Sequence, residues 1–177
     1  MLERIIIAGA GGQGIMLFGK VIAQSAMVDG RYVTWIPAYG PEVRGGAAHC
    51  AVTVSDGEIG SPYVDKVDTL VVMNAVALLK FKDRVRPSGL LMLNSSFEQS
   101  RVDCRGLSII RHPFTDIAIR LGNIRVANMV ALGCLLAKKK IVPIASVVEA
   151  MRQMAPKDKP ELFDINYRAL ITGTELT

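Results

Sequence analysis

The chain has 177 residues, half of them apolar and 21% charged, with a formal net charge of +5 at pH 7. Its apolar runs near residues 70–79 and 129–137 are about half as long as the roughly 20 residues that a membrane-spanning helix needs, which excludes a membrane span. The basic residues are scattered, and their one run, Lys138–Lys140, closes an apolar helical stretch, where lysines complement the helix dipole. This pattern argues against a nucleic-acid partner.

The predicted elements begin with a buried strand at Ile5–Ala8, a glycine turn and a helix over Gln13–Ala26 whose apolar residues follow a helical period. A second β-rich run, Tyr32–Ile36, completes a strand–helix–strand unit and favours a parallel sheet. Residues 37–46 are predicted to form a loop. The alternation from Ala48 to Val54, followed by Asp56-Gly57, is typical of a strand and a hairpin-type turn, so we expect the sheet to include an antiparallel portion.

The alternation of strands and helices continues along the chain, and the C-terminal part is rich in helix. Further strands are predicted at Leu70–Met73 and, after the turn Pro87–Gly89, at Leu90–Leu93. The predicted helices cover Ala75–Phe81, Pro113–Gly122, Ile124–Lys139, Pro143–Met154 and Glu161–Ile171, the last ending at Gly173. The sequence therefore predicts an α/β protein: a three-layer, Rossmann-like, open mixed (mainly parallel) sheet with helices on both faces, in a single domain over residues 1–177.

Cysteine usage bears on cofactors. Cys50, Cys104 and Cys134 are widely separated, whereas zinc sites and iron–sulfur clusters need closely spaced cysteines. We therefore expect neither a metal site nor a cluster in this chain. The sequence runs from Met1 directly into a strand pattern, without the basic and apolar regions of a secretory signal, so a cytoplasmic location is predicted.

The first turn contains Gly9, Gly11 and Gly14, which fit the pattern G-x-G-x-x-G of a phosphate-binding turn at a helix N-terminus. A nicotinamide-binding domain also needs an acidic residue at the end of the second strand, and here that strand ends Trp35-Ile36-Pro37-Ala38. The turn therefore favours the pyrophosphate of another ligand over NAD. The alternative is that the glycines only allow the helix and the sheet to pack closely.

A second motif, Tyr39-Gly-Pro-Glu-Val-Arg-Gly-Gly46, follows the second strand and is predicted to lie at the same carboxyl edge as the glycine turn. Arg44 suits a phosphate or carboxylate because its guanidinium makes bidentate hydrogen bonds. An ion pair with Glu42 is the alternative. Tyr39 is either a contact to a partner or ligand, or a loop anchor.

Three motifs in this order, Gly11-Gly-Gln-Gly-Ile15, Tyr39–Gly46 and Ser55-Asp-Gly-Glu-Ile-Gly-Ser-Pro62, closely resemble the gamma subunit of 2-oxoacid:ferredoxin oxidoreductases, above all the 2-oxoglutarate branch. Further matches at Asn128–Gly133 and Asn166–Gly173 extend the resemblance over essentially the whole chain. The resemblance implies an enzyme complex in which thiamine diphosphate and the iron–sulfur clusters are carried by other subunits, with ferredoxin or flavodoxin as the electron acceptor. It also implies that this chain is not active alone.

The same resemblance implies a site for coenzyme A, a co-substrate with a pyrophosphate. Backbone N–H groups at Gly11, Gly12 and Gly14 are expected to take the pyrophosphate, with Gln13 as a side-chain donor and Arg44 as a nearby positive charge. Asn74 and Asn128, which follow a strand and open a helix, are expected either to face this site or to cap helices.

No catalytic residue is predicted in this chain. His49 lies on the less apolar side of a strand, His112 is predicted to lie in a loop, and no serine or cysteine nucleophile motif is present. Three alternatives to a 2-oxoglutarate enzyme remain open: a gamma subunit for a branched-chain or aryl 2-oxoacid, a stand-alone NAD(P)-binding protein, and a non-catalytic interaction subunit whose glycines only pack.

Overall fold

The structure is a computed structural model that describes residues 1–38, 48–97, 104–156 and 158–176. Its described residues form one sheet in the order β2-β3-β1-β4-β5-β6. The strands are β1 (Leu2–Gly9), β2 (Tyr32–Ala38), β3 (Ala48–Ser55), β4 (Val67–Val72), β5 (Val85–Asn94) and β6 (Ser108–His112).

Strand directions in this sheet bring five carboxyl ends to one edge. β3 pairs antiparallel with both β1 and β2, whereas β1, β4, β5 and β6 pair parallel in series. β2 therefore runs in the same direction as β1, and only β3 runs against the other described strands. This confirms the prediction of a mixed, mainly parallel sheet, and the carboxyl edge is where such sheets place ligands.

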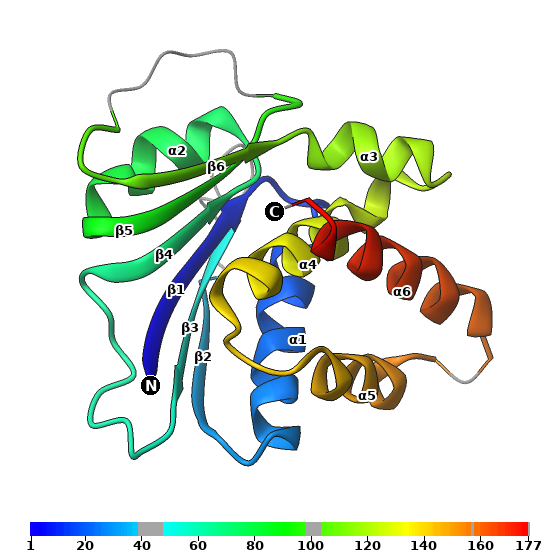
Figure 1. Ribbon diagram of the computed structural model, residues 1–177, viewed down its shortest axis with the longest axis horizontal. Helices are drawn as coiled ribbons and strands as arrows, with labels where there is room; N and C mark the ends of the chain where they lie inside the picture. The colour runs from blue at the N-terminus through cyan, green and yellow to red at the C-terminus, as the bar shows by residue number, and fades with distance from the viewer. Residues whose placement is uncertain (39–47, 98–103, 157, 177) are drawn as a thin grey trace.

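Helices cover both faces of the sheet, as predicted (Figure 1). The face formed by Ile5 and Ile7 of β1 packs against most of the helices, and the opposite face, with Ile6 and Ala8, packs against α2. On the first side lie α1 (Ile15–Val28), α3 (Phe114–Arg120), α4 (Ala127–Lys139), α5 (Ile144–Met154) and α6 (Pro160–Thr174), and on the second side lies α2 (Ala75–Phe81).

Four local predictions differ from the structure. β6 was not predicted, and His112 is its last residue rather than part of a loop. Residues 87–89 lie within β5, at an irregularity of its pairing with β4, and do not form a separate turn. Asp56-Gly57 is not a hairpin turn, because the chain leaves β3 there for β4, which is not its neighbour in the sheet. Gly173 lies inside α6 and does not end it.

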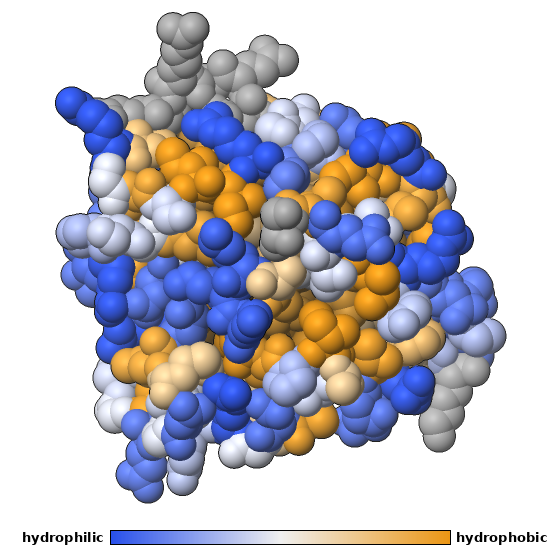
Figure 2. Space-filling model, in the orientation of Figure 1, coloured by the Kyte–Doolittle hydropathy of each residue, from blue (hydrophilic) through white to orange (hydrophobic). Residues whose placement is uncertain are grey.

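α4 is the most buried helix of the described chain, from Ala127 to Leu136, and α6 packs along it. The helices α4 and α6 approach closely at Gly133 and Gly173, whose added Cβ atoms would each lie 2.0 Å from a carbonyl oxygen of the facing helix. Apolar side chains also gather in patches on the surface, separated by polar ones (Figure 2). In the described part of the chain, no helix has the length and apolar character needed to cross a bilayer.

Candidate functional site

The glycine turn between β1 and α1 lies at the carboxyl edge of the sheet. Gly12 and Gly14 have φ angles of 84° and 71°, a left-handed backbone that favours glycine. No side chain of the described residues caps the start of α1, so the first N–H groups of this 14-residue helix are available to hydrogen-bond an anion.

The side chain of Gln13 holds this turn in place. Its Oε1 accepts a hydrogen bond from the Ala10 N–H at 2.6 Å, and its Nε2 donates to the Met73 carbonyl at 3.2 Å. Met73 follows β4, and its N–H donates to the Ala8 carbonyl of β1 at 2.8 Å. The Gln13 amide therefore ties the turn to the neighbouring strand end. A direct contact of Gln13 with a ligand stays a prediction.

The side chain of Asn128 also contacts the glycine turn. It is 1% exposed, and its Nδ2 donates to the Gly14 carbonyl at 3.1 Å. A Cβ at Gly14 would lie 2.3 Å from that Nδ2. Asn128 is not a helix cap, because α4 begins one residue earlier and the residue at its N-cap is Val126. Its geometry instead makes it a positioning residue for the glycine turn.

Asn74 caps α2, which was one of the two predicted roles. Its Oδ1 accepts a hydrogen bond from the Ala77 N–H at 2.8 Å, in the usual geometry of an N-cap. Arg44, together with Tyr39 and Glu42, lies outside the described residues.

A hollow of about 290 Å³ opens beside the glycine turn. It is lined by Gly11, Gly12, Gln13, Met73, Phe97, Thr115, Ile124, Arg125 and Ala127. Of the predicted site residues in the described chain, the first three line it, while Gly14, Asn74 and Asn128 do not. A second hollow of about 180 Å³ lies among α1, α5 and α6, and the described residues that line it are apolar apart from Asn166. Of these two hollows, the larger is the one that residues of the glycine turn line.

Gly11 differs from the other glycines of the turn. Its φ is not in the left-handed region, and a Cβ added there would meet no atom of the described residues within 4 Å. A Cβ at Gly9, by contrast, would lie 2.5 Å from Gln13 Oε1 and 2.9 Å from Met73 Cβ. Close packing therefore accounts for Gly9 and Gly14, but neither the backbone conformation nor packing against the described residues requires glycine at position 11. The space that Gly11 leaves belongs to the hollow.

Asn94 holds Thr115, one of the residues that line the hollow, in place. It is 1% exposed at the end of β5, and its Nδ2 donates to Thr115 Oγ1 at 2.8 Å, while its Oδ1 accepts from the Thr115 N–H at 3.4 Å. These bonds hold the start of α3 against the sheet edge, where Thr115 lines the hollow.

Arg125 is a site residue that the sequence did not single out. It lies in the short 3₁₀ helix η3 (Ile124–Val126), whose start is capped by Asn123 through a 3.0 Å bond from the Arg125 N–H. Its side chain is exposed and forms no ion pair with any described residue. In the sequence it reads as an ordinary charge at the start of a long helix, because nothing local indicates that η3 returns to the glycine turn.

Comparison with known proteins identifies the fold family. The model of the family described as pyruvate ferredoxin/flavodoxin oxidoreductase matches residues 4–176. The chain belongs to this family. It is 37% identical over 183 residues to the 2-oxoglutarate synthase subunit KorC of Methanothermobacter marburgensis, covering 99% of this chain and 97% of KorC. It is also 37% identical over 179 residues to the ketoisovalerate oxidoreductase subunit VorA of Methanothermobacter thermautotrophicus, covering 97% of this chain but only 36% of VorA.

A solved structure with the same fold is the 2-oxoglutarate:ferredoxin oxidoreductase of Magnetococcus marinus with 2-oxoglutarate, coenzyme A and succinyl-CoA bound. It is 26% identical with a TM-score of 0.89, over 99% of this chain and 31% of the Magnetococcus chain. The chain therefore spans about a third of the length of some relatives and almost all of others.

None of the cysteines or histidines is among the described residues that line the hollow. Cys50 and Cys134 are buried, and burial raises the pKa of the Cys50 thiol to about 12 and that of Cys134 to about 11. The ring centroids of His49 and Phe81 are 4.6 Å apart, and those of His112 and Phe114 are 6.0 Å apart. Within the described ranges, no three His, Cys, Asp or Glu side chains gather as a metal site would require.

These pKa values predict which thiol reacts first. Because the thiolate is the reactive form, a thiol with a pKa of about 12 is ionised to roughly one part in ten thousand at pH 8. We expect an alkylating reagent at pH 8 to modify half-buried Cys104 in the folded protein, and all three cysteines only after denaturation. Peptide mass spectrometry over time measures this. Modification of Cys50 as fast as Cys104 in the folded protein would contradict it.

Proposed function

We propose that the chain is the gamma subunit of a 2-oxoglutarate:ferredoxin oxidoreductase, in which it helps to bind coenzyme A and to complete an active site carried by partner subunits. The complex converts 2-oxoglutarate, coenzyme A and two oxidised ferredoxins to succinyl-CoA, carbon dioxide, a proton and two reduced ferredoxins. The match to KorC over nearly the full length of both chains supports this branch, and a flavodoxin is an alternative electron acceptor.

Thiamine diphosphate and iron–sulfur clusters would supply the carbon–carbon bond cleavage and the electron transfer, and we assign both to partner subunits. The contribution of this chain is binding and orientation. The glycine turn and the start of α1 present N–H groups to a diphosphate, and the Gln13 and Asn128 side chains keep the turn in one conformation.

The observation that carries the proposal is the open space at Gly11. A glycine that packing does not require, and that lines a hollow at the ligand-binding edge of the sheet, is explained by the close approach of a ligand to its backbone. Among the described residues that line the hollow there is no Asp or Glu for the ribose of NAD, which supports coenzyme A over a nicotinamide cofactor.

A branched-chain 2-oxoacid is the second candidate substrate, because VorA is as similar to this chain as KorC. The two are separated by purifying the tagged complex and assaying coenzyme-A-dependent reduction of a low-potential dye with several 2-oxoacids. We expect 2-oxoglutarate to give the highest kcat/KM. Preference for ketoisovalerate would replace the substrate while keeping the enzyme class, and a lone chain that binds NAD(P) would overturn the proposal.

Gly11→Val tests the role of the turn. We expect the KM for coenzyme A to rise at least about tenfold, because the added side chain fills the space that the ligand needs, while kcat and melting temperature change little. Steady-state kinetics of the complex and thermal unfolding measure this.

Gly57→Val is the matched control, since Gly57 is exposed, also has an open Cβ position and lies outside the lining of the hollow. An unchanged KM for coenzyme A in Gly11→Val, with the complex intact, would remove the glycine turn from the binding site.

A further inference from the structure

We propose, resting on the coenzyme A site proposed above, that this chain holds the nucleotide end of coenzyme A, with Arg125 binding the diphosphate and with Phe97 and Ile124 contacting the adenine. The long pantetheine arm then leaves the hollow and carries the thiol to the partner subunits.

Charge is the first argument. The diphosphate carries two negative charges, and transferring it from water into a hollow requires compensating positive charge. Arg125 is the only charged side chain that lines this hollow in the described part of the chain. No described carboxylate forms an ion pair with it, so its charge is available to a ligand.

The placement of Arg125 is the second argument. Its backbone is fixed on one side by the Asn123 cap and on the other by Val126, which is 3% exposed. It faces the same hollow as Gly11 and Gly12, so a diphosphate there can accept hydrogen bonds from the turn and from the guanidinium together. The planar guanidinium suits two phosphate oxygens at once.

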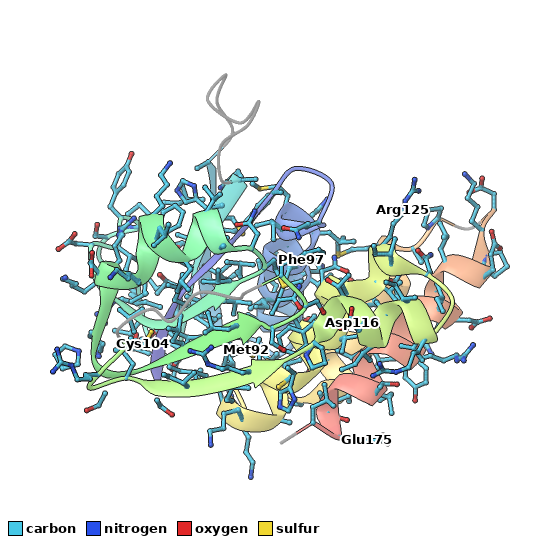
Figure 3. All side chains as sticks on the ribbon, turned by 90° about the horizontal axis from the view of Figure 1, so that it is seen from above. Met92, Phe97, Cys104, Asp116, Arg125 and Glu175 are labelled. Carbon is cyan, nitrogen blue, oxygen red and sulfur yellow. The ribbon has the colours of Figure 1, made fainter. Side chains whose placement is uncertain are left out.

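The apolar lining is the third argument. Phe97 and Ile124 are 49% and 55% exposed and both line the hollow, so they offer apolar surface to a ligand there. Phe97 comes from the segment after β5 and Arg125 from η3, and both are labelled in Figure 3. A flat, uncharged adenine can pack on these side chains beside the diphosphate. Apart from Arg125, no described residue that lines the hollow carries a positive charge that could bind the 3′-phosphate of coenzyme A.

Size decides which part of the ligand fits. A volume of about 290 Å³ is just below the range of roughly 300–1,000 Å³ that small-molecule sites have. That is enough for part of coenzyme A and too little for its whole length. The charge and the apolar surface both select the adenosine diphosphate part.

The test uses the purified complex and the variants Arg125→Ala and Arg125→Lys. We expect Arg125→Ala to raise the KM for coenzyme A about tenfold or more with kcat within about twofold, and Arg125→Lys to restore only part of the affinity because an ammonium lacks the fork. Arg120→Ala is the matched control: Arg120 is exposed on α3 and does not line the hollow.

Truncated ligands locate the contact. Dephospho-coenzyme A, which keeps the diphosphate but lacks the 3′-phosphate, should show the same rise in KM for Arg125→Ala. Pantetheine, which lacks the nucleotide, should show none. By calorimetry, adenosine diphosphate should bind the wild-type complex more tightly than the complex with either Arg125→Ala or Phe97→Ala.

The outcomes separate this inference from the proposed function. If Gly11→Val raises the KM for coenzyme A and Arg125→Ala does not, the site stands and the role of Arg125 is overturned. The role of Arg125 is also overturned if Arg125→Ala raises the KM only for full-length coenzyme A and not for dephospho-coenzyme A. An equal rise in the KM for pantetheine overturns it as well. If neither variant changes the KM, the proposed coenzyme A site itself fails.

Discussion

Replacing Gly133 by alanine is expected to destabilise the fold by about 3 kcal/mol, at the upper end of what overpacking costs, although it adds a single methyl group. A Cβ at Gly133 would lie 2.0 Å from the Leu170 carbonyl oxygen and 3.0 Å from the Gly173 Cα. These neighbours are backbone atoms of α6, which cannot rotate away as a side chain can. The helices must therefore separate, and the buried side chains between them lose close packing.

The facing glycine gives a second, independent variant. A Cβ at Gly173 would lie 2.0 Å from the Val130 carbonyl oxygen, so Gly173→Ala should cost a similar amount. Because both substitutions push the same pair of helices apart, the double variant should lose less than the sum of the two single losses.

Urea denaturation and thermal unfolding measure these effects. For a chain of this length a loss of about 3 kcal/mol corresponds to a fall in melting temperature of roughly 6–12 °C. Gly57→Ala, at an exposed bend with an open Cβ position, should change stability by less than about 0.5 kcal/mol. A Gly133→Ala protein as stable as the Gly57→Ala control would mean that α4 and α6 do not approach as closely as described.

Strong periodic patterns made most of the fold predictable. The helix predicted at Ala75–Phe81 has those bounds, and the buried strands around Ile5 and Leu70 lie in the centre of the sheet. The sequence did not predict β6 because it is an edge strand: it pairs with one neighbour and is largely open to solvent, so it needs few apolar residues. Its residues Ser108–His112 are all exposed or half-buried, and no continuous apolar run marks the strand.

The candidate site was predictable where it is local in sequence and not where it depends on tertiary contacts. The glycine turn combines left-handed glycines and a helix start within a few residues, so its pattern is visible in the sequence. Phe97 and Arg125 line the same hollow as the glycine turn but come from segments more than 80 residues away in the sequence, in the connections that follow β5 and α3. The sequence also gave no indication that the Asn128 amide bonds to the Gly14 carbonyl, because the two residues are 114 positions apart.

Gly14→Ala is expected to lower stability by about 3 kcal/mol and to weaken coenzyme A binding, for two separate reasons. The φ of 71° costs an alanine about 1–2 kcal/mol. In addition, the new Cβ would lie 2.3 Å from Asn128 Nδ2 and 2.9 Å from its Cγ, which adds a cost typical of overpacking, about 1–3 kcal/mol. Asn128→Ala alone should cost about 1–2 kcal/mol, because the Gly14 carbonyl keeps its bond from the Phe18 N–H at 2.9 Å.

Combining the two substitutions separates strain from steric clash. In an Asn128→Ala background the nearest remaining atom to the new Cβ is Asn128 Cβ, at 3.5 Å, an ordinary contact. Gly14→Ala should then cost only the backbone term, so the double variant should be more stable than the sum of the single losses predicts by about 1–3 kcal/mol. Denaturation of all four proteins measures this coupling. Strictly additive losses would mean that Asn128 does not press on the turn, and its role in positioning the backbone proposed to bind the ligand would have to be abandoned.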